Sequence, residues 1–195
     1  MNATAANTRE QLLDYAQSLI GARGCNGFSY RDLADHVGVK TSSIHYYFPC
    51  KDDLVREAIE AYSQNAIARV HAIDASLPAD EKLRRYADVL EGVVCSGKQL
   101  CIGGVLAADM NSLPESVRCV VKTFFLAMEA WLAAVLREGV EQGTVTLRCD
   151  AETSARALFA AVQGSMLSTR VFGDCNRIRE TITSVCPSAG SPSTH

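Results

Sequence analysis

FSYRDLADHVGVKTSSIHYYFPCKDD, residues 28–53, is the stretch that decides the fold. Ser29 is a favourable helix-capping residue, and Asp32 falls in the first turn of the helix that follows, where negative charge suits the helix dipole. Gly38 then provides a turn residue that can adopt a positive φ. A second short helix follows, with Ile44 on its inward face. Two short helices around a glycine turn predict a helix-turn-helix unit, which places its second helix in the DNA major groove.

The outward side of the second helix carries short hydroxyls, a base and donor-bearing rings, which can reach phosphates or base edges. Lys51 follows at the start of the next helix, where a helix N-terminus also favours phosphate. The residues that we expect to contact DNA are Ser29, Tyr30, Arg31, Lys40, Thr41, Ser42, Ser43, His45, Tyr46, Tyr47 and Lys51. The plainer alternative is an ordinary helical hairpin with a solvated polar face. Small Ala34, the turn glycine and the polar face coincide as DNA docking requires, and this favours the helix-turn-helix.

A longer stretch, TREQLLDYAQSLIGARGCNGFSYRDLADHVGVKTSSIHYYFPCKDDLVREAI, resembles the N-terminal DNA-binding domain of the TetR family of bacterial transcriptional regulators. It includes the ending typical of that family, here YYFPCKDDL. Two residues depart from the pattern. Lys40 and Cys50 stand where the family usually has a hydroxyl residue capping the next helix. Each lost cap costs about 1 kcal/mol, so the expected fold is unchanged, and Lys40 adds a positive charge near the DNA.

The charge balance excludes a generic nucleic-acid coat protein, because the 195-residue chain has a net charge of −3. Between Arg23 and Lys51, four Lys or Arg residues stand against two Asp residues. The expected DNA footprint is therefore only modestly positive. We infer that base contacts and geometry carry much of the selectivity, with a moderate dependence on salt.

The eight cysteines are scattered, without a Cys-x-x-Cys pair or a Cys/His quartet, so we expect no zinc site, and we expect no cofactor. The N-terminal segment, Met1–Asn7, is short and polar and lacks the charged start and apolar run of a signal peptide. No stretch approaches the roughly 18 apolar residues of a membrane span. These features predict a cytoplasmic protein without a membrane partner. In that reducing compartment we expect no disulfide framework.

The rest of the chain predicts an all-α fold of about nine helices. A first helix, Thr8–Arg23, begins with a capping box of Thr8 and Gln11 and supports the helix-turn-helix. The predicted domains are a three-helix DNA-binding domain at 1–50, a helical effector-binding and dimerisation domain at 51–186, and a disordered tail at 187–195. Further helices are expected at 51–73, from residue 78, at 114–142, at 151–172 after the capping residue Asp150, and at 176–185.

The family resemblance implies a homodimer in which the last two helices pair with their mates as a four-helix bundle. Two DNA-binding domains about one helical turn apart would then read a pseudo-palindromic operator. The residues that we expect at the contact are Leu158, Ala161, Val162, Ser165, Ile178 and Ile182. The alternative is that these helices pack only within one chain.

The resemblance also implies a pocket for an inducer between the long helices, which would suit a small hydrophobic ligand. Phe125, Met128 and Trp131 are the expected lining, although apolar residues at helical spacing are core by default. Cys95 and Cys101 lie in VVCSGKQLCIGGVLAADMNSLPESV, which is similar to a subgroup of the family. Cys101 would lie at a helix N-terminus near Lys98, which favours a thiolate able to sense electrophiles. The alternative is a buried, inert thiol.

The sequence therefore predicts a ligand- or redox-responsive transcriptional regulator. We expect a repressor, because repression is the usual mode of action in the family that it resembles. We expect no enzymatic activity, since there is no nucleophile elbow, metal-ligand motif or phosphate loop. The rival interpretation is a small-molecule or thiol-redox binding protein of the same fold that does not bind DNA.

Overall fold

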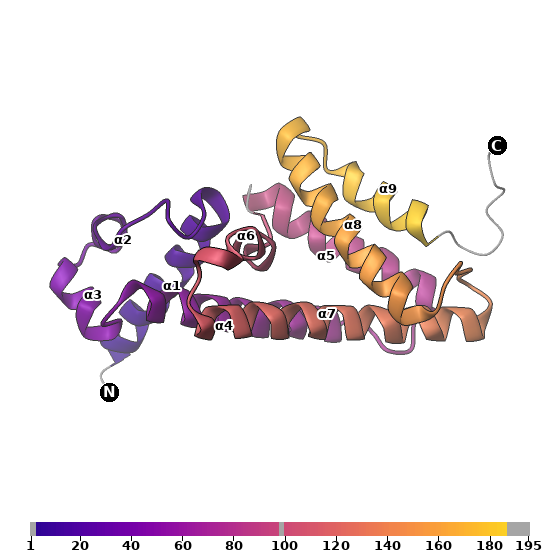
Figure 1. The fold of residues 1–195 in the computed structure, drawn as a ribbon, viewed down its shortest axis with the longest axis horizontal. Helices are drawn as coiled ribbons and strands as arrows, with labels where there is room; N and C mark the ends of the chain where they lie inside the picture. The colour runs from indigo at the N-terminus through magenta and orange to yellow at the C-terminus, as the bar shows by residue number, and fades with distance from the viewer. Residues whose placement is uncertain (1–2, 98–99, 187–195) are drawn as a thin grey trace. The chain divides into compact units, whose positions relative to one another are not determined.

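The computed structural model describes residues 3–97 and 100–186, and every regular element in these ranges is helical (Figure 1). The elements are α1 (Ala3–Arg23), α2 (Tyr30–Val37), α3 (Thr41–Tyr47), α4 (Lys51–His71), α5 (Ala79–Gly97), α6 (Ile102–Ala108), the 3₁₀ turn η1 (Met110–Ser112), α7 (Glu115–Gln142), α8 (Ala151–Phe172) and α9 (Asn176–Val185). The predicted all-α fold is confirmed. The expected tail, 187–195, lies outside the described residues.

The chain divides into two compact units, which we call the head unit and the body unit. The head unit comprises Met1–Asn65 and Cys101–Phe124, and the body unit comprises Ala66–Leu100 and Phe125–His195. The head unit therefore contains more than the expected domain at 1–50, because it also takes in most of α4 together with α6 and the start of α7. Helices α4 and α7 each contribute to both units.

Helix α1 supplies the apolar face on which the head unit packs. Leu12, Ala16 and Ile20 recur at helical spacing and are fully buried. The helix begins at Ala3, so Thr8 lies inside it and cannot cap its start. The predicted capping box of Thr8 and Gln11 is therefore wrong, because the local capping pattern is overridden by a helix that extends further toward the N-terminus.

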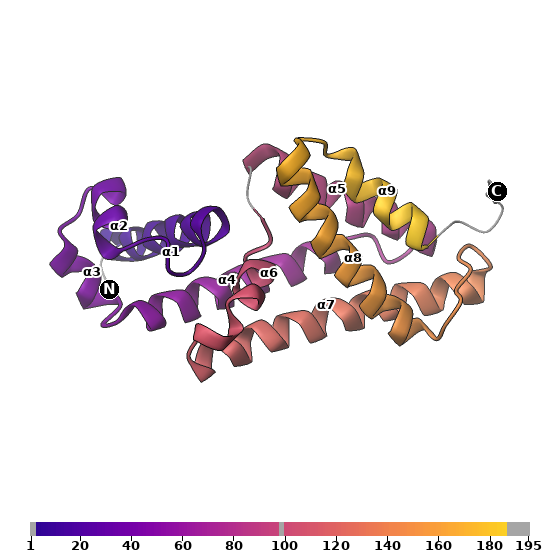
Figure 2. The ribbon, with the colours of Figure 1, turned by 45° about the horizontal axis from the view of Figure 1, so that its top comes forward.

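The body unit is built around α5, α8, α9 and most of α7. Helices α8 and α9 form a side-by-side pair, and α9 also packs on α5 (Figures 1 and 2). The bounds predicted for α8 and α9 are confirmed. Asp150 caps α8 as expected, since its side chain accepts a hydrogen bond of 2.8 Å from the Thr153 amide.

Helix α7 corrects the expectation that no stretch of the chain approaches a membrane span. Residues 115–141 are long and apolar enough to cross a membrane by length and composition, since their most apolar 18-residue window has a mean hydropathy of 1.8. A core helix meets the same criterion. Val117 and Val121 are buried in the head unit, and Leu132 and Leu136 are buried in the body unit. Packing in the two units therefore accounts for part of the apolar character of α7, since 39% of its most apolar window is buried.

Close packing of α6 on α7 within the head unit gives a stability prediction. A Cβ atom on Gly103 would lie 2.6 Å from the ring of Phe124, which is itself buried. We expect Gly103→Ala to lower the free energy of unfolding by about 1–3 kcal/mol, because the ring has little room to move. Gly92→Ala is the matched control, since a Cβ there meets open space, and it should be neutral or stabilising by about 0.5–1 kcal/mol. Urea unfolding measures both, and equal stability of the two variants would contradict the predicted packing.

Candidate nucleic-acid interface

The turn between α2 and α3 has the geometry of a helix-turn-helix corner. Gly38 adopts φ 76° and ψ 32°, and its amide donates to the Ala34 carbonyl at 2.9 Å. At the other end of α2, the hydroxyl and the amide of Ser29 both donate to the Asp32 carboxylate, at 2.6 and 2.8 Å. These hydrogen bonds lower the pKa of Asp32, because they stabilise its charged form. The turn glycine and the start of α2 are therefore as the sequence predicts.

Helix α3 is held on the head unit by a few apolar side chains. It has seven residues, of which Ile44 is fully buried, and Phe48 directly after it is fully buried as well. Tyr46 is 83% exposed. The helix thus uses one side for packing and offers the other to solvent, which is the arrangement of a recognition helix.

Two residues expected to contact DNA also make contacts that hold the scaffold around α3. The Tyr30 hydroxyl donates to the Phe48 carbonyl at 2.9 Å, and burial raises the pKa of Tyr30 to about 12. The Lys51 ammonium donates to the Phe28 carbonyl at 2.6 Å and lies 4.2 Å from the centre of the Phe28 ring. Both side chains therefore position the ends of α2, α3 and α4.

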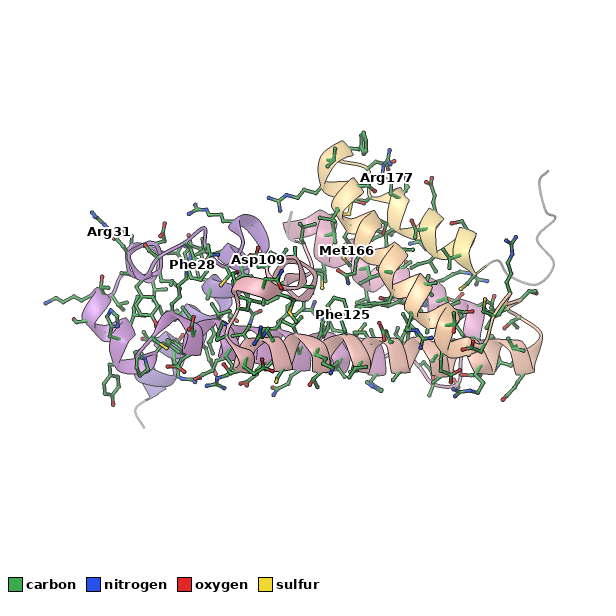
Figure 3. All side chains as sticks on the ribbon, viewed as in Figure 1. Phe28, Arg31, Asp109, Phe125, Met166 and Arg177 are labelled. Carbon is green, nitrogen blue, oxygen red and sulfur yellow. A yellow bond between two sulfur atoms is a disulfide. The ribbon has the colours of Figure 1, made fainter. Side chains whose placement is uncertain are left out.

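The other expected residues divide by exposure. Those that are exposed are Ser29, Arg31, Lys40, Thr41, Ser42, His45 and Tyr46, whereas Ser43 and Tyr47 are half-buried. Figure 3 shows Arg31 extending away from the head unit. Over the ranges that the structure describes, Arg31 and Lys40 form no ion pair. These two cations are therefore available to phosphate.

Other cations of the head unit are used internally. Arg23 forms an ion pair with Asp32 at 3.3 Å. Arg9 pairs with Glu57, and its guanidinium lies 5.2 Å from the centre of the Phe48 ring. The sequence did not indicate these contacts, because each joins residues that are well separated along the chain. The free positive charge on this surface is consequently smaller than a count of Lys and Arg suggests.

The residues expected to line an effector pocket are packed in the body unit. Met128 is buried, Phe125 meets Phe159 edge-to-face with ring centres 5.1 Å apart, and the Trp131 ring lies 5.4 Å from that of buried Tyr86. These aromatic contacts bring together α7, α8 and α5. They fit the default interpretation of these residues as core.

The two cysteines expected to sense effectors have different environments. Cys101 directly precedes α6 and is only 4% exposed. This burial favours the alternative of a buried, inert thiol. Lys98 lies outside the described residues. Cys95 forms a disulfide with Cys175, with the two Cα atoms 6.3 Å apart. The sequence led us to expect no disulfide framework, and this single bond was not anticipated; it means that Cys95 is not a free thiol. Sequence spacing gave no sign of this pairing.

The residues expected at a dimer contact also need revision. Leu158, Val162, Ser165, Ile178 and Ile182 are buried within the chain itself, and Ala161 is half-buried. The periodicity correctly identified an apolar face, but that face packs inside one body unit. The exposed side of α8 carries a different set at helical spacing: Ala157, Ala160, Gly164, Leu167 and Val171.

Comparisons with known proteins agree with both parts of the chain. Residues 12–58 match the family model for bacterial regulatory proteins, tetR family, and residues 79–185 match the tetracyclin repressor-like, C-terminal domain. The HTH-type transcriptional repressor KstR2 of Mycolicibacterium smegmatis is 24% identical over 141 residues, which cover 71% of this chain and 68% of that protein. An HTH-type transcriptional regulator of Lactococcus lactis is 26% identical over 176 residues, 87% of either chain. A TetR-family regulator from Agrobacterium tumefaciens superposes with a TM-score of 0.86 at 34% identity, covering 92% of this chain and 96% of that one.

The contact between Tyr30 and Phe48 predicts a pH-dependent stability. Tyr30→Phe removes the hydroxyl that donates to the Phe48 carbonyl and should cost about 1 kcal/mol at pH 7. The raised pKa of Tyr30, about 12 in the folded protein, means that its stabilising effect is complete below the unfolded pKa near 10. That effect is lost as the pH rises from about 10 through 12. Urea unfolding of both proteins from pH 7 to 12 should therefore show the difference shrinking, and a constant difference would contradict the assignment.

Proposed function

The chain belongs to the tetR family of bacterial regulatory proteins, and we propose that it is a repressor that binds a pseudo-palindromic DNA operator as a homodimer and leaves it when a small effector binds. The observation that carries the proposal is the surface of α3. Anchored by Ile44 and Phe48, this helix keeps a polar side exposed, and Arg31 and Lys40 are exposed cations without an ion pair in the part of the chain that the structure describes.

The chemistry of that surface suits direct reading of bases in the major groove. Thr41 and Ser42 offer hydroxyls at the start of α3, and His45 and Tyr46 offer ring donors further along. Such groups can both donate to phosphate oxygens and contact base edges. His45 is partly oriented already, because its ring meets that of Tyr30 edge-on with centres 4.8 Å apart. The protein therefore presents a preformed set of contacts.

A single head unit offers little charge for binding DNA. Arg31 and Lys40 would neutralise only a few phosphates, and each phosphate contact adds about 0.9 to the dependence of log affinity on log salt. Two head units in one dimer would double the contacts and fix their spacing to one helical turn of DNA. The low local charge thus supports a dimer as the binding species.

The exposed side of α8 supplies a surface on which a second copy can pack. Leu167, Val171 and Phe172 are 56%, 75% and 65% exposed, an unusual cluster of large apolar side chains in contact with water. Earlier in the helix, Ala157, Ala160 and Gly164 are small and would allow another helix to approach closely. We call this surface, comprising these six residues, the α8 surface.

Release by an effector requires that a change in the body unit reach the residues of the head unit that contact DNA. Helix α4 is continuous from Lys51 in the head unit to His71 in the body unit. Lys51 donates a hydrogen bond to the Phe28 carbonyl of the head unit. A ligand that binds one arrangement of the body more tightly would shift the population toward it, by no more than the difference in its two affinities. The burial of Cys101 favours a small hydrophobic effector over an electrophile that would react with that thiol.

The same proposal places the protein in the cytoplasm, where a bacterial chromosome lies, and assigns it no enzymatic role. The rival is a small-molecule or thiol-redox binding protein that does not bind DNA. It accounts for the body unit but leaves the exposed polar side of α3 without a function. Selection of DNA from a random pool with the purified protein distinguishes them. The repressor enriches an inverted repeat, and the rival enriches nothing.

Tyr46→Ala tests the α3 surface directly. Because Tyr46 is 83% exposed, its loss should leave the free energy of unfolding within about 0.5 kcal/mol. Operator affinity should fall about tenfold or more in a fluorescence-anisotropy titration, as expected for a lost base contact.

Lys40→Ala should reduce the slope of log affinity against log salt by about 1 per head unit. Arg148→Ala removes an exposed cation from the body unit and serves as the charge-matched control, with affinity and slope unchanged. Equal losses for Lys40→Ala and Arg148→Ala would argue against the α3 surface.

Val171→Glu tests the α8 surface. A carboxylate in an apolar helix contact would be desolvated without a partner, so the variant should be monomeric at concentrations where the wild type is dimeric. It should also bind the operator at least tenfold more weakly while keeping its helical content. Leu126→Glu is the matched control, because Leu126 is 56% exposed on α7, and it should stay dimeric. Sedimentation velocity gives the result, and a dimeric Val171→Glu variant would place the contact elsewhere.

A further inference from the structure

We propose that Cys95 and Cys175 form a reversible thiol–disulfide switch in the body unit, operated by small-molecule thiols and disulfides, and that its redox state changes operator affinity. The inference rests on the proposed function, because it names a regulatory input to the same DNA-binding protein. It replaces the expectation that Cys101 is the sensing thiol.

The pair has the geometry and the accessibility that such a switch needs. The Cα atoms of Cys95 and Cys175 are 6.3 Å apart, within the range of about 4.4–6.8 Å for disulfides. Cys95 is exposed and Cys175 is half-buried, so small reagents can reach the bond. A regulator that binds chromosomal DNA works in a reducing compartment, where disulfides are mostly transient or redox-sensing. Exposed disulfides are also the more labile ones.

The disulfide ties the end of α5 to the turn between α8 and α9. Gly173 ends α8 with φ 70°, and Cys175 directly precedes α9. Across this turn, the guanidinium of Arg177 on α9 lies 4.1 Å from the centre of the exposed Phe172 ring at the end of α8, and Figure 3 shows Arg177 at this corner. Because Phe172 belongs to the α8 surface, a change at Cys175 acts on the end of the proposed dimer contact.

Helix α9 keeps other contacts with α5 when the disulfide opens. Arg179 donates to Asp88 and Glu91 of α5, each at 2.7 Å. Ile178 and Ile182 are buried on the same helix. Reduction should therefore loosen the turn without unfolding the body unit, which is the property that separates a switch from a purely structural crosslink.

The position of Cys95 along the chain also suits a regulatory role. It lies six residues before Cys101, where the chain re-enters the head unit. A covalent bond at Cys95 restrains the last turn of α5, the final body helix before that crossing. The disulfide thus acts on the last turn of α5 as well as on the proposed dimer contact.

The chemistry balances as two successive exchanges with a small disulfide, R–S–S–R. The Cys95 thiolate attacks one sulfur of the reagent, forming a mixed disulfide and expelling the first thiolate, RS⁻. The Cys175 thiolate then attacks the Cys95 sulfur and expels the second RS⁻. The two protein thiols lose two electrons and two protons, and the reagent becomes two thiols, R–SH. An excess of R–SH reverses both steps.

The test uses the full chain with the exposed free cysteines replaced, as Cys50→Ser, Cys119→Ser and Cys149→Ser, so that only the pair is accessible. The protein is equilibrated without denaturant in buffers of reduced and oxidised glutathione, alkylated and weighed by mass spectrometry. We expect two thiols to appear and disappear together. The oxidised form should melt about 10 °C higher, because the bond closes a loop across a separation of 80 residues. A pair that stays oxidised until the protein is denatured would overturn the proposal.

Operator affinity is then measured for both forms on the selected DNA. We expect a difference of about fivefold or more. Adding Cys175→Ser should remove the redox dependence and leave the affinity at that of the reduced form. Affinities that agree within fivefold would overturn the switch and leave the repressor intact. Absence of specific binding in both forms would instead overturn the proposed function and the coupling with it, while the alkylation result would still show whether the pair exchanges.

Discussion

The burial of Ile44 and Phe48 is the contact on which the DNA interface depends. A helix of seven residues is too short to be stable in water by itself, since isolated helices of fewer than about 12 residues are marginal. Its position is therefore set by tertiary contacts. Tyr30 adds to the anchoring by donating to the Phe48 carbonyl at the end of α3, and Lys51 donates to the Phe28 carbonyl just before α2. Because so few residues fix the helix, the remaining positions of α3 are free to serve recognition.

This anchoring also decides how the positive charge of the head unit is used. Lys51, Arg23 and Arg9 are engaged in contacts within the protein, whereas Arg31 and Lys40 are exposed without an ion pair in the described ranges. Electrostatic attraction by one head unit is correspondingly weak. In the proposed dimer, specific binding would come from the fit of α3 and from the spacing of two head units, so the geometry of that dimer would be part of the recognition.

The sequence predicted features that depend on local signals and missed those that depend on tertiary contacts. Gly38, Asp150 and the bounds of α8 follow from turn and capping chemistry over a few residues. The hydrogen bond from Lys51 to the Phe28 carbonyl was missed because the two residues are 23 positions apart and no local signal links them. The dimer residues were misplaced for a related reason. Periodicity identifies an apolar face of a helix, but it does not say whether the same chain or a second copy covers that face, and Leu158 is covered by its own chain.

The Cys95–Cys175 disulfide is the clearest case of a tertiary feature that sequence spacing cannot show. It is also a stronger link between α5 and the α8–α9 turn than the ion pairs nearby. The ion pairs of Arg179 with Asp88 and Glu91 join the same two helices, but the Arg179 side chain is 42% exposed. Pairs of that exposure contribute about 1 kcal/mol or less and weaken as salt rises. The covalent bond is insensitive to salt and responds only to thiols and oxidants. In the proposed switch, the junction of α5 with the α8–α9 turn depends more on redox state than on ionic strength, which would separate this input from the salt-sensitive contact proposed between the head unit and DNA.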